Sequence, residues 1–163
     1  MTEPVVVSAE DARTDTDDAA VDLDRWRDLA EAALLTEGAE GELALTFVDE
    51  EDIAALNAQH MGKSGPTDVL SFPMDDEPQP GVPQLLGDVV VAPSVAMAQF
   101  EDHAGTYDDE LALLVVHGVL HVLGHDHAEP DEATLMRDRE RALLVQHHWR
   151  AQPPGGFRHT HAD

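Results

Sequence analysis

The segment with the clearest chemistry is HGVLHVLGHDH, residues 117–127, where four of the chain's ten histidines interrupt an apolar run. His117 and His121 lie four residues apart, and on a helix this spacing places both imidazoles on one face, close enough to bind one ion. Gly124 follows where a left-handed turn would reverse the chain, which would bring His127 back as a third ligand. The spacing therefore predicts a metal site formed by His117, His121 and His127.

Zinc is the metal that this ligand set favours. Three histidines and one open position are typical of catalytic Zn²⁺, which lowers the pKa of its bound water to about 7. Imidazole also suits nickel, copper and iron, so another divalent metal is an alternative. The chain has no cysteine, which excludes thiolate ligands, disulfides and cysteine nucleophiles. We expect one Zn²⁺ ion at the end of a core helix.

The same spacing, H-x3-H-x2-G-x2-H, is that of the metzincin metalloproteases, with one difference. Gly118 stands where those enzymes have the glutamate that acts as general base. A metalloprotease-like peptidase is therefore an alternative function, weakened by Gly118. Asp126 either orients an imidazole from outside the ligand shell or caps the turn, and His125 is out of ligand register. The remaining histidines lack ligand spacing: His60, His103, His147, His148, His159 and His161.

The elements that position these histidines follow from apolar periodicity and turn residues. We predict strands at 4–8, 42–49, 65–74 and 85–93, and helices at 22–38, 50–59, 94–103, 111–124 and 129–149. Asp22 or Asp24 can cap the first helix and Ser94 the third. Pro66 and Pro73 bracket the third strand, which predicts an edge position or a bulge. Early strands and late helices predict an α+β fold with a small, mixed four-stranded sheet and about five helices.

Length and composition predict one domain. The 163 residues are 42% hydrophobic, and we assign residues 1–150 to a single domain. The segment AQPPGGFRHTHAD, residues 151–163, is rich in helix breakers and is expected to be a disordered tail. The sequence shows no secretory signal and no apolar run long enough to span a membrane, which predicts a cytoplasmic location without a membrane partner.

Charge limits the partners of the chain. The formal net charge is −25 at pH 7, which opposes binding to polyanions because nonspecific nucleic-acid affinity comes mainly from Lys and Arg. None of the nine Lys and Arg residues lies between Lys63 and Arg137, a span that includes the histidine cluster. A phosphate-binding site in that span would need another cation.

Four sequence motifs together carry a family resemblance. They are LN at 56–57, PTDVLSFP at 66–73, LGDVVV at 86–91 and HGVLHVLGHDH at 117–127. In order and spacing they resemble the YbeY family of bacterial endoribonucleases over most of the chain. The resemblance implies a zinc-dependent, single-strand-specific endoribonuclease, a hydrolase of RNA phosphodiester bonds. Such an enzyme helps mature ribosomal RNA, particularly the 3′ end of the small-subunit RNA, and acts in ribosome quality control.

Position by position, the resemblance assigns the ligands to His117, His121 and His127, on an α+β fold. It implies single-stranded or ribosomal RNA, the small ribosomal subunit and assembly proteins as partners. Many family members have an arginine after the Leu-Asn pair, where this chain has Met61; Lys63 could replace it, or be an ordinary loop residue. The bound zinc could itself be the main attractor of phosphate.

The sequence is compatible with two routes of RNA cleavage. No side chain clearly supplies a general base, and Lys63 and Asp126 are the candidates. Either a zinc-bound water acts at the phosphodiester, or zinc polarises the phosphate for attack by the ribose 2′-OH. A noncatalytic ribosome-assembly factor with a structural metal is a further alternative, although structural zinc sites usually have four protein ligands.

Overall fold

Among the described residues, the sheet has four strands in the order β1-β2-β4-β3. The computed structural model describes residues 5–14, 19–74, 84–125, 129–155 and 157. The strands are β1 (Val5–Asp11), β2 (Gly41–Phe47), β3 (Val69–Pro73) and β4 (Leu85–Val91). β1, β2 and β4 run parallel, whereas β3 pairs with β4 in the antiparallel sense and forms an edge. The sheet is mixed, and the edge position indicated by the two prolines is confirmed.

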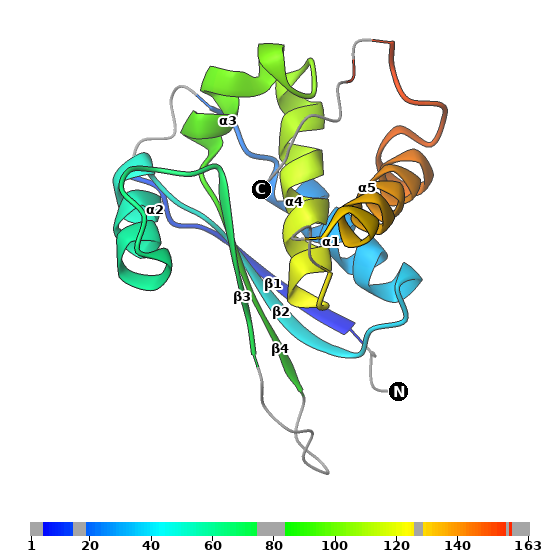
Figure 1. The fold of residues 1–163 in the computed structure, drawn as a ribbon, viewed down its shortest axis with the longest axis horizontal. Coiled ribbons are helices and arrows are strands. Elements are labelled where there is room, and N and C mark those ends of the chain that lie inside the picture. Colours follow the sequence, from blue (N-terminus) through cyan, green and yellow to red (C-terminus); the bar gives the residue numbers. More distant parts are fainter. Residues whose placement is uncertain (1–4, 15–18, 75–83, 126–128, 156, 158–163) are drawn as a thin grey trace.

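In the part of the chain that the structure describes, five α-helices pack around this sheet (Figure 1). They are α1 (Leu23–Thr36), α2 (Glu50–Leu56), α3 (Pro93–Gln99), α4 (Tyr107–Val122) and α5 (Pro130–Leu143). Short helical turns extend three of them: η1 (Asn57–Met61), η2 (Phe100–Asp102) and η3 (Leu144–Trp149). α1 and α4 pack on one face of the sheet in the main core, and α5 packs on α4. The predicted α+β class and the number of elements are confirmed.

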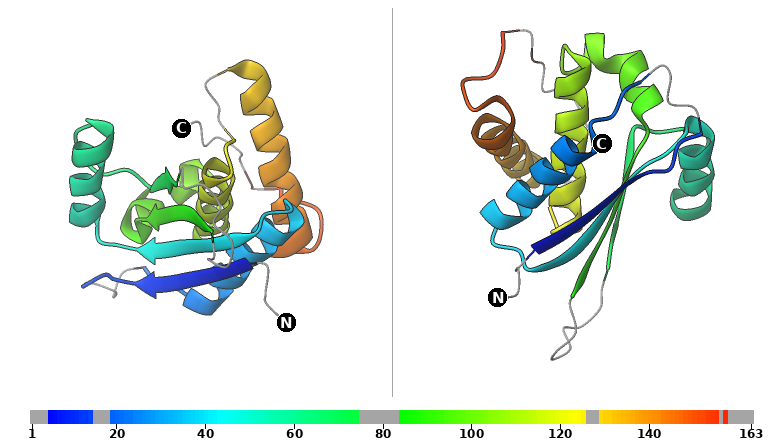
Figure 2. Two further views of the ribbon diagram at one scale, coloured as in Figure 1. Left: turned by 90° about the horizontal axis from the view of Figure 1, so that it is seen from below. Right: turned by 180° about the vertical axis from the view of Figure 1, so that it is seen from behind.

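A smaller core lies on the other face of the sheet, beneath α2. Ile53 of α2 is fully buried there against Leu70 of β3 and Val90 of β4. The two views in Figure 2 show α2 and α5 standing on either side of α4. No helix in the described part of the chain is long and apolar enough to cross a membrane.

α4 begins earlier than its apolar run predicts. Its first residue is Tyr107, not Leu111, because the Thr106 hydroxyl accepts a hydrogen bond from the Asp109 amide at 3.1 Å. The acidic first turn also suits the positive end of the helix dipole. Every residue from Asp109 to Leu120 is buried, so α4 is the central helix of the domain.

Several other boundaries differ from the prediction, of which those of β1 and α3 have clear causes, and one cap is confirmed. β1 continues to Asp11 instead of ending at Ser8, since its acidic last residues still pair with β2. α3 begins at Pro93, and Ser94 is not its cap; proline suits the first helical position because it needs no amide donor there. Asp22 does cap α1, accepting from the Arg25 amide at 3.3 Å.

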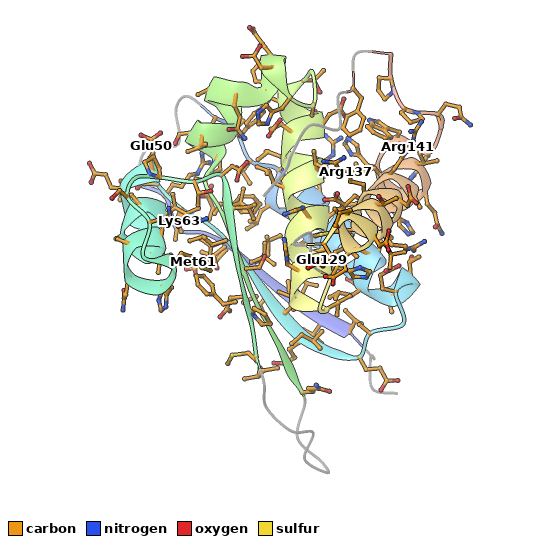
Figure 3. The ribbon with its side chains drawn as sticks, viewed as in Figure 1. Glu50, Met61, Lys63, Glu129, Arg137 and Arg141 are labelled. Atoms are coloured by element: carbon orange, nitrogen blue, oxygen red, sulfur yellow. The ribbon has the colours of Figure 1, made fainter. Side chains whose placement is uncertain are left out.

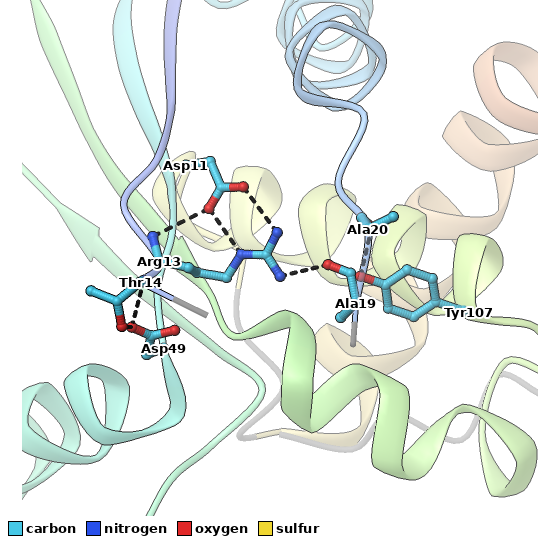
Figure 4. A network of polar contacts seen from close by, with 7 residues as sticks. All are labelled: Asp11, Arg13, Thr14, Ala19, Ala20, Asp49 and Tyr107. Atoms are coloured by element: carbon cyan, nitrogen blue, oxygen red, sulfur yellow. Dashed lines mark hydrogen bonds and ion pairs between the residues drawn. The ribbon is translucent and has the colours of Figure 1, made fainter. Parts of the chain in front are cut away.

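A polar network joins the end of β1 to the start of α4 (Figure 4). The Arg13 guanidinium donates to both carboxylate oxygens of Asp11 at 2.9 Å and to the Ala19 carbonyl at 2.6 Å. The Tyr107 hydroxyl donates to the neighbouring Ala20 carbonyl at 2.9 Å. Burial raises the pKa of Tyr107 to about 12, so this donor keeps its proton at neutral pH.

We expect Arg13→Met to lower the free energy of unfolding by about 2 kcal/mol at neutral pH, because the Arg13 side chain is only 4% exposed and bonds a carboxylate. The Arg13 hydrogen bond lowers the pKa of Asp11. A lowered folded pKa means that the pair stabilises the fold fully above the ordinary aspartate pKa, and that this contribution is lost as the pH falls through the folded value.

Urea unfolding of the wild type and Arg13→Met across this pH range measures the effect. The difference between the two proteins should shrink below about pH 4. An equal difference at neutral and acidic pH would show that the pair does not contribute through its charge.

Candidate functional site

A pocket of about 500 Å³ brings together three of the four sequence motifs. It is lined by Asn57 and Met61 of η1, by Lys63 in the loop that follows, by Ser71 on β3, and by His117 and His121 on α4, among others. The LN, PTDVLSFP and histidine segments are separated in sequence but meet at this place. The pocket is therefore the candidate functional site.

His117 and His121 lie side by side on consecutive turns of α4. Their ring centroids are 4.5 Å apart and the rings meet edge to face at 79°. His117 is 3% exposed, while His121 is partly exposed. The prediction that both imidazoles share one face of a helix is confirmed, and that face opens on the pocket.

A buried carboxylate fixes the orientation of His117. Glu140 of α5 lies with its Oε2 atom 2.7 Å from Nδ1 of His117, and Glu140 is only 1% exposed. An ionised carboxylate only accepts hydrogen bonds, so Nδ1 donates and any ligand of His117 binds through Nε2. Histidines that ligate metals are typically held in this way by a carboxylate.

Glu140 has no ligand spacing, so motif reasoning missed it. One signal was available: Glu140 shares the buried face of α5 with Met136 and Leu143. A charged residue at a core position of a helix is seldom fully buried without a partner. The sequence could thus have indicated a buried polar contact, although not its partner.

The predicted ligand His127 and the candidate Asp126 lie outside the described residues. Within the described ranges, no three His, Asp or Glu side chains are arranged to hold a metal ion. The pair that is described fits such a site, since two neighbouring imidazoles face one pocket and one of them is oriented by a carboxylate.

The turn that leads toward His127 is well anchored. Gly124 has a φ of +101°, and its amide donates to the His121 carbonyl at 3.0 Å, which confirms the turn predicted there. The next residue, His125, places Nε2 at 3.7 Å from Glu37 at the end of α1. Glu37 also pairs with Arg139 of α5. His125 thus lies near the Glu37–Arg139 ion pair that joins α1 to α5.

Asn57 shapes the loop that carries Lys63 to the pocket. Its side-chain amide donates to the Gly65 carbonyl at 3.0 Å, and the Lys63 amide donates to the Asn57 carbonyl at 3.3 Å. Gly62 ends η1 in the left-handed conformation with a φ of +66°. Met61 is 44% exposed beside them. Lys63 therefore reaches the same pocket as the histidines.

Gly118 faces the sheet and leaves no room for a side chain. A Cβ atom at this position would lie 2.5 Å from Cγ1 of Val89 on β4. The Ser71 hydroxyl donates to the Gly118 carbonyl at 3.2 Å from the neighbouring strand. A glutamate here would collide with β4, so close packing of α4 on the sheet explains the glycine, and the peptidase alternative loses its general base on steric grounds.

We expect Gly118→Ala to lower the free energy of unfolding by about 1–3 kcal/mol, because Val89 is fully buried and β-branched and cannot move away cheaply. The measurement is chemical denaturation of Gly118→Ala, Val89→Ala and the double variant. Truncating Val89 removes the clash, so the double variant should lose less stability than the two single variants lose together. Strictly additive losses would contradict this packing.

The fold and the pocket define an α+β protein whose central helix presents a pair of histidines at a polar site. The chain matches the family model described as Endoribonuclease YbeY over residues 9–148. It belongs to the YbeY family, which confirms the resemblance.

Individual relatives agree with this membership. Endoribonuclease YbeY of Leifsonia xyli is 50% identical over 111 residues, 65% of this chain and 72% of the relative. Endoribonuclease YbeY of Thermobifida fusca is 49% identical over 110 residues, 64% of this chain and 70% of the relative. The solution structure of a Thermotoga maritima protein aligns with a TM-score of 0.60 at 24% identity, covering 89% of this chain and 92% of that one. That structure shows the same fold.

Proposed function

We propose that this chain is a zinc-dependent endoribonuclease that cleaves single-stranded RNA and acts in the cytoplasm. Its role would be maturation of ribosomal RNA, particularly at the 3′ end of the small-subunit RNA, and ribosome quality control. The observation that carries the proposal is the His117–His121 pair, oriented by Glu140 at a pocket that Lys63 also lines. Family membership supports RNA as the substrate, because curated relatives bear the name endoribonuclease.

His117, His121 and His127 would hold the metal. When bound, Zn²⁺ supplies Lewis-acid stabilisation of charge on the phosphodiester oxygens and lowers the pKa of water. Glu140 keeps the proton of His117 on Nδ1 and thereby presents Nε2 for binding. Another divalent metal is compatible with the same ligands.

The pocket favours a single strand over a duplex. His117 is almost completely buried, so a phosphodiester must enter the pocket to reach it. A single strand can bend and splay its bases as it enters, whereas a double helix presents a stiff cylinder. On the wall formed by the loop after η1, the Lys63 ammonium would bind a backbone phosphate and compensate for the missing arginine at Met61.

Cleavage of a fluorescent single-stranded RNA oligonucleotide, by protein whose zinc content has been measured, tests this proposal. We expect His121→Ala to lose most of its zinc and to cleave at least about 100-fold more slowly. His147→Ala is the matched control, because His147 lies on η3 and does not line the pocket. It should retain both zinc and activity.

The other outcomes have definite meanings. Zinc-loaded wild type without cleavage would support the noncatalytic assembly factor. Proteolysis of an unstructured protein that disappears in His121→Ala would support the peptidase. Product ends separate the two routes of RNA cleavage, since a 2′,3′-cyclic phosphate indicates attack by the 2′-OH and a 5′-phosphate indicates attack by water.

We also expect Glu140→Gln to weaken zinc binding by about 10- to 100-fold, because the carboxylate that orients His117 is replaced by a neutral amide. Competition with a chromogenic chelator on the metal-free protein measures this affinity without any reaction. Glu132→Gln is the control on the exposed first turn of the same helix. Unchanged zinc affinity in a folded Glu140→Gln variant would refute the orienting role.

A further inference from the structure

Two exposed arginines of α5 have no ionic partner within the described part of the chain. Arg137 and Arg141 form no ion pair or hydrogen bond there, although acidic residues greatly outnumber basic ones. Four other arginines do pair with carboxylates: Arg13, Arg25, Arg27 and Arg139. Arg150, which follows η3, also lacks such a partner among the described residues, but Arg137 and Arg141 are the two that lie one turn apart on the same helix.

The spacing of the two arginines places like charges next to each other on the helix. Residues four apart on a helix are neighbours, and like charges at this spacing repel by a few tenths of a kcal/mol. Neither side chain is buried, so packing does not explain them. A bound anion between the two guanidinium groups would convert this repulsion into attraction, because arginine matches the oxygens of a phosphate group.

The position of the pair relates it to the pocket. Arg137 is one helical turn before Glu140, whose carboxylate contacts His117, so the two residues occupy adjoining parts of the α5 surface. Arg139 points to a different flank, where it pairs with Glu37 at the end of α1. Figure 3 shows Arg137 and Arg141 on one side of α4 and Lys63 on the other.

We propose that Arg137 and Arg141 form a phosphate-binding site for the RNA strand, on the opposite side of the histidine pair from Lys63. This inference rests on the proposed function. The strand would cross the pocket from the loop after η1 to α5, with a cationic contact on each side. The cations that flank the long gap in the sequence, Lys63 and Arg137, would then also flank the site in space.

The double variant Arg137→Gln/Arg141→Gln tests the proposal. Arg25→Gln/Arg27→Gln on α1 is the control, because it makes the same change in net charge on a different helix. With zinc-loaded protein and single-stranded RNA, we expect the KM of the α5 variant to rise about tenfold, with kcat within about twofold of wild type. The control should change KM by less than about twofold.

The salt dependence gives an independent measure. Each phosphate contact to a single strand contributes about 0.7 to the slope of log(kcat/KM) against log salt, so losing two contacts should reduce the slope by about 1.4. Arg137→Lys/Arg141→Lys should recover much of the slope because it keeps the charge. Melting temperatures of all variants check that each one is folded.

Several results would overturn the inference. An unchanged KM, or an equal rise in both glutamine variants, would show that the α5 pair has no specific contact with RNA. A fall in kcat alone would point instead to a disturbed Glu140. If wild type cleaves RNA and the α5 variant behaves identically, only this inference fails; if wild type neither binds nor cleaves RNA, the proposed function fails with it.

Discussion

The close contact between Gly118 of α4 and Val89 of β4 sets the rotation of the central helix. With position 118 against the sheet, the helical period of about 100° per residue turns positions 117 and 121 to one common side. That side faces the pocket and not the apolar core. The absence of a side chain at Gly118 therefore allows the buried helix α4 to direct two imidazoles into the pocket.

Buried polar groups then determine which elements surround α4. Asp109 accepts hydrogen bonds from the ring nitrogens of His148 and Trp149 on η3. Glu110 accepts a hydrogen bond from Gln99 at 2.9 Å, and His117 is hydrogen-bonded to Glu140. An unsatisfied buried polar group costs about 1–3 kcal/mol, and more if it is charged. Apolar contacts alone would tolerate other arrangements of the surrounding helices. These polar bonds favour one arrangement, and it is the one that places α5 beside the pocket.

Local signals were sufficient for part of this architecture. The shared face of His117 and His121 and the turn at Gly124 follow from spacing and backbone chemistry, which act within a few residues. The contact between Glu140 and His117 does not follow from local signals, because the two residues are 23 positions apart and meet only when α5 packs on α4. The extension of β1 to Asp11 was missed for the same reason, since pairing with β2 outweighs the turn-like local composition. Strand order is likewise a product of long-range packing.

The acidity of the chain does not exclude an RNA substrate, because electrostatic repulsion is local in salt. At physiological ionic strength the Debye length is about 8 Å, so carboxylates on remote surfaces act weakly on a strand at the pocket. The buried Glu140 carboxylate would offset part of the charge of a bound divalent metal. Apart from a bound metal, the attraction would have to come from cations at the edges of the site. Under the proposed function, Lys63 and the arginine pair of α5 would provide such cations without placing a positive side chain among the proposed metal ligands, where it would oppose metal binding.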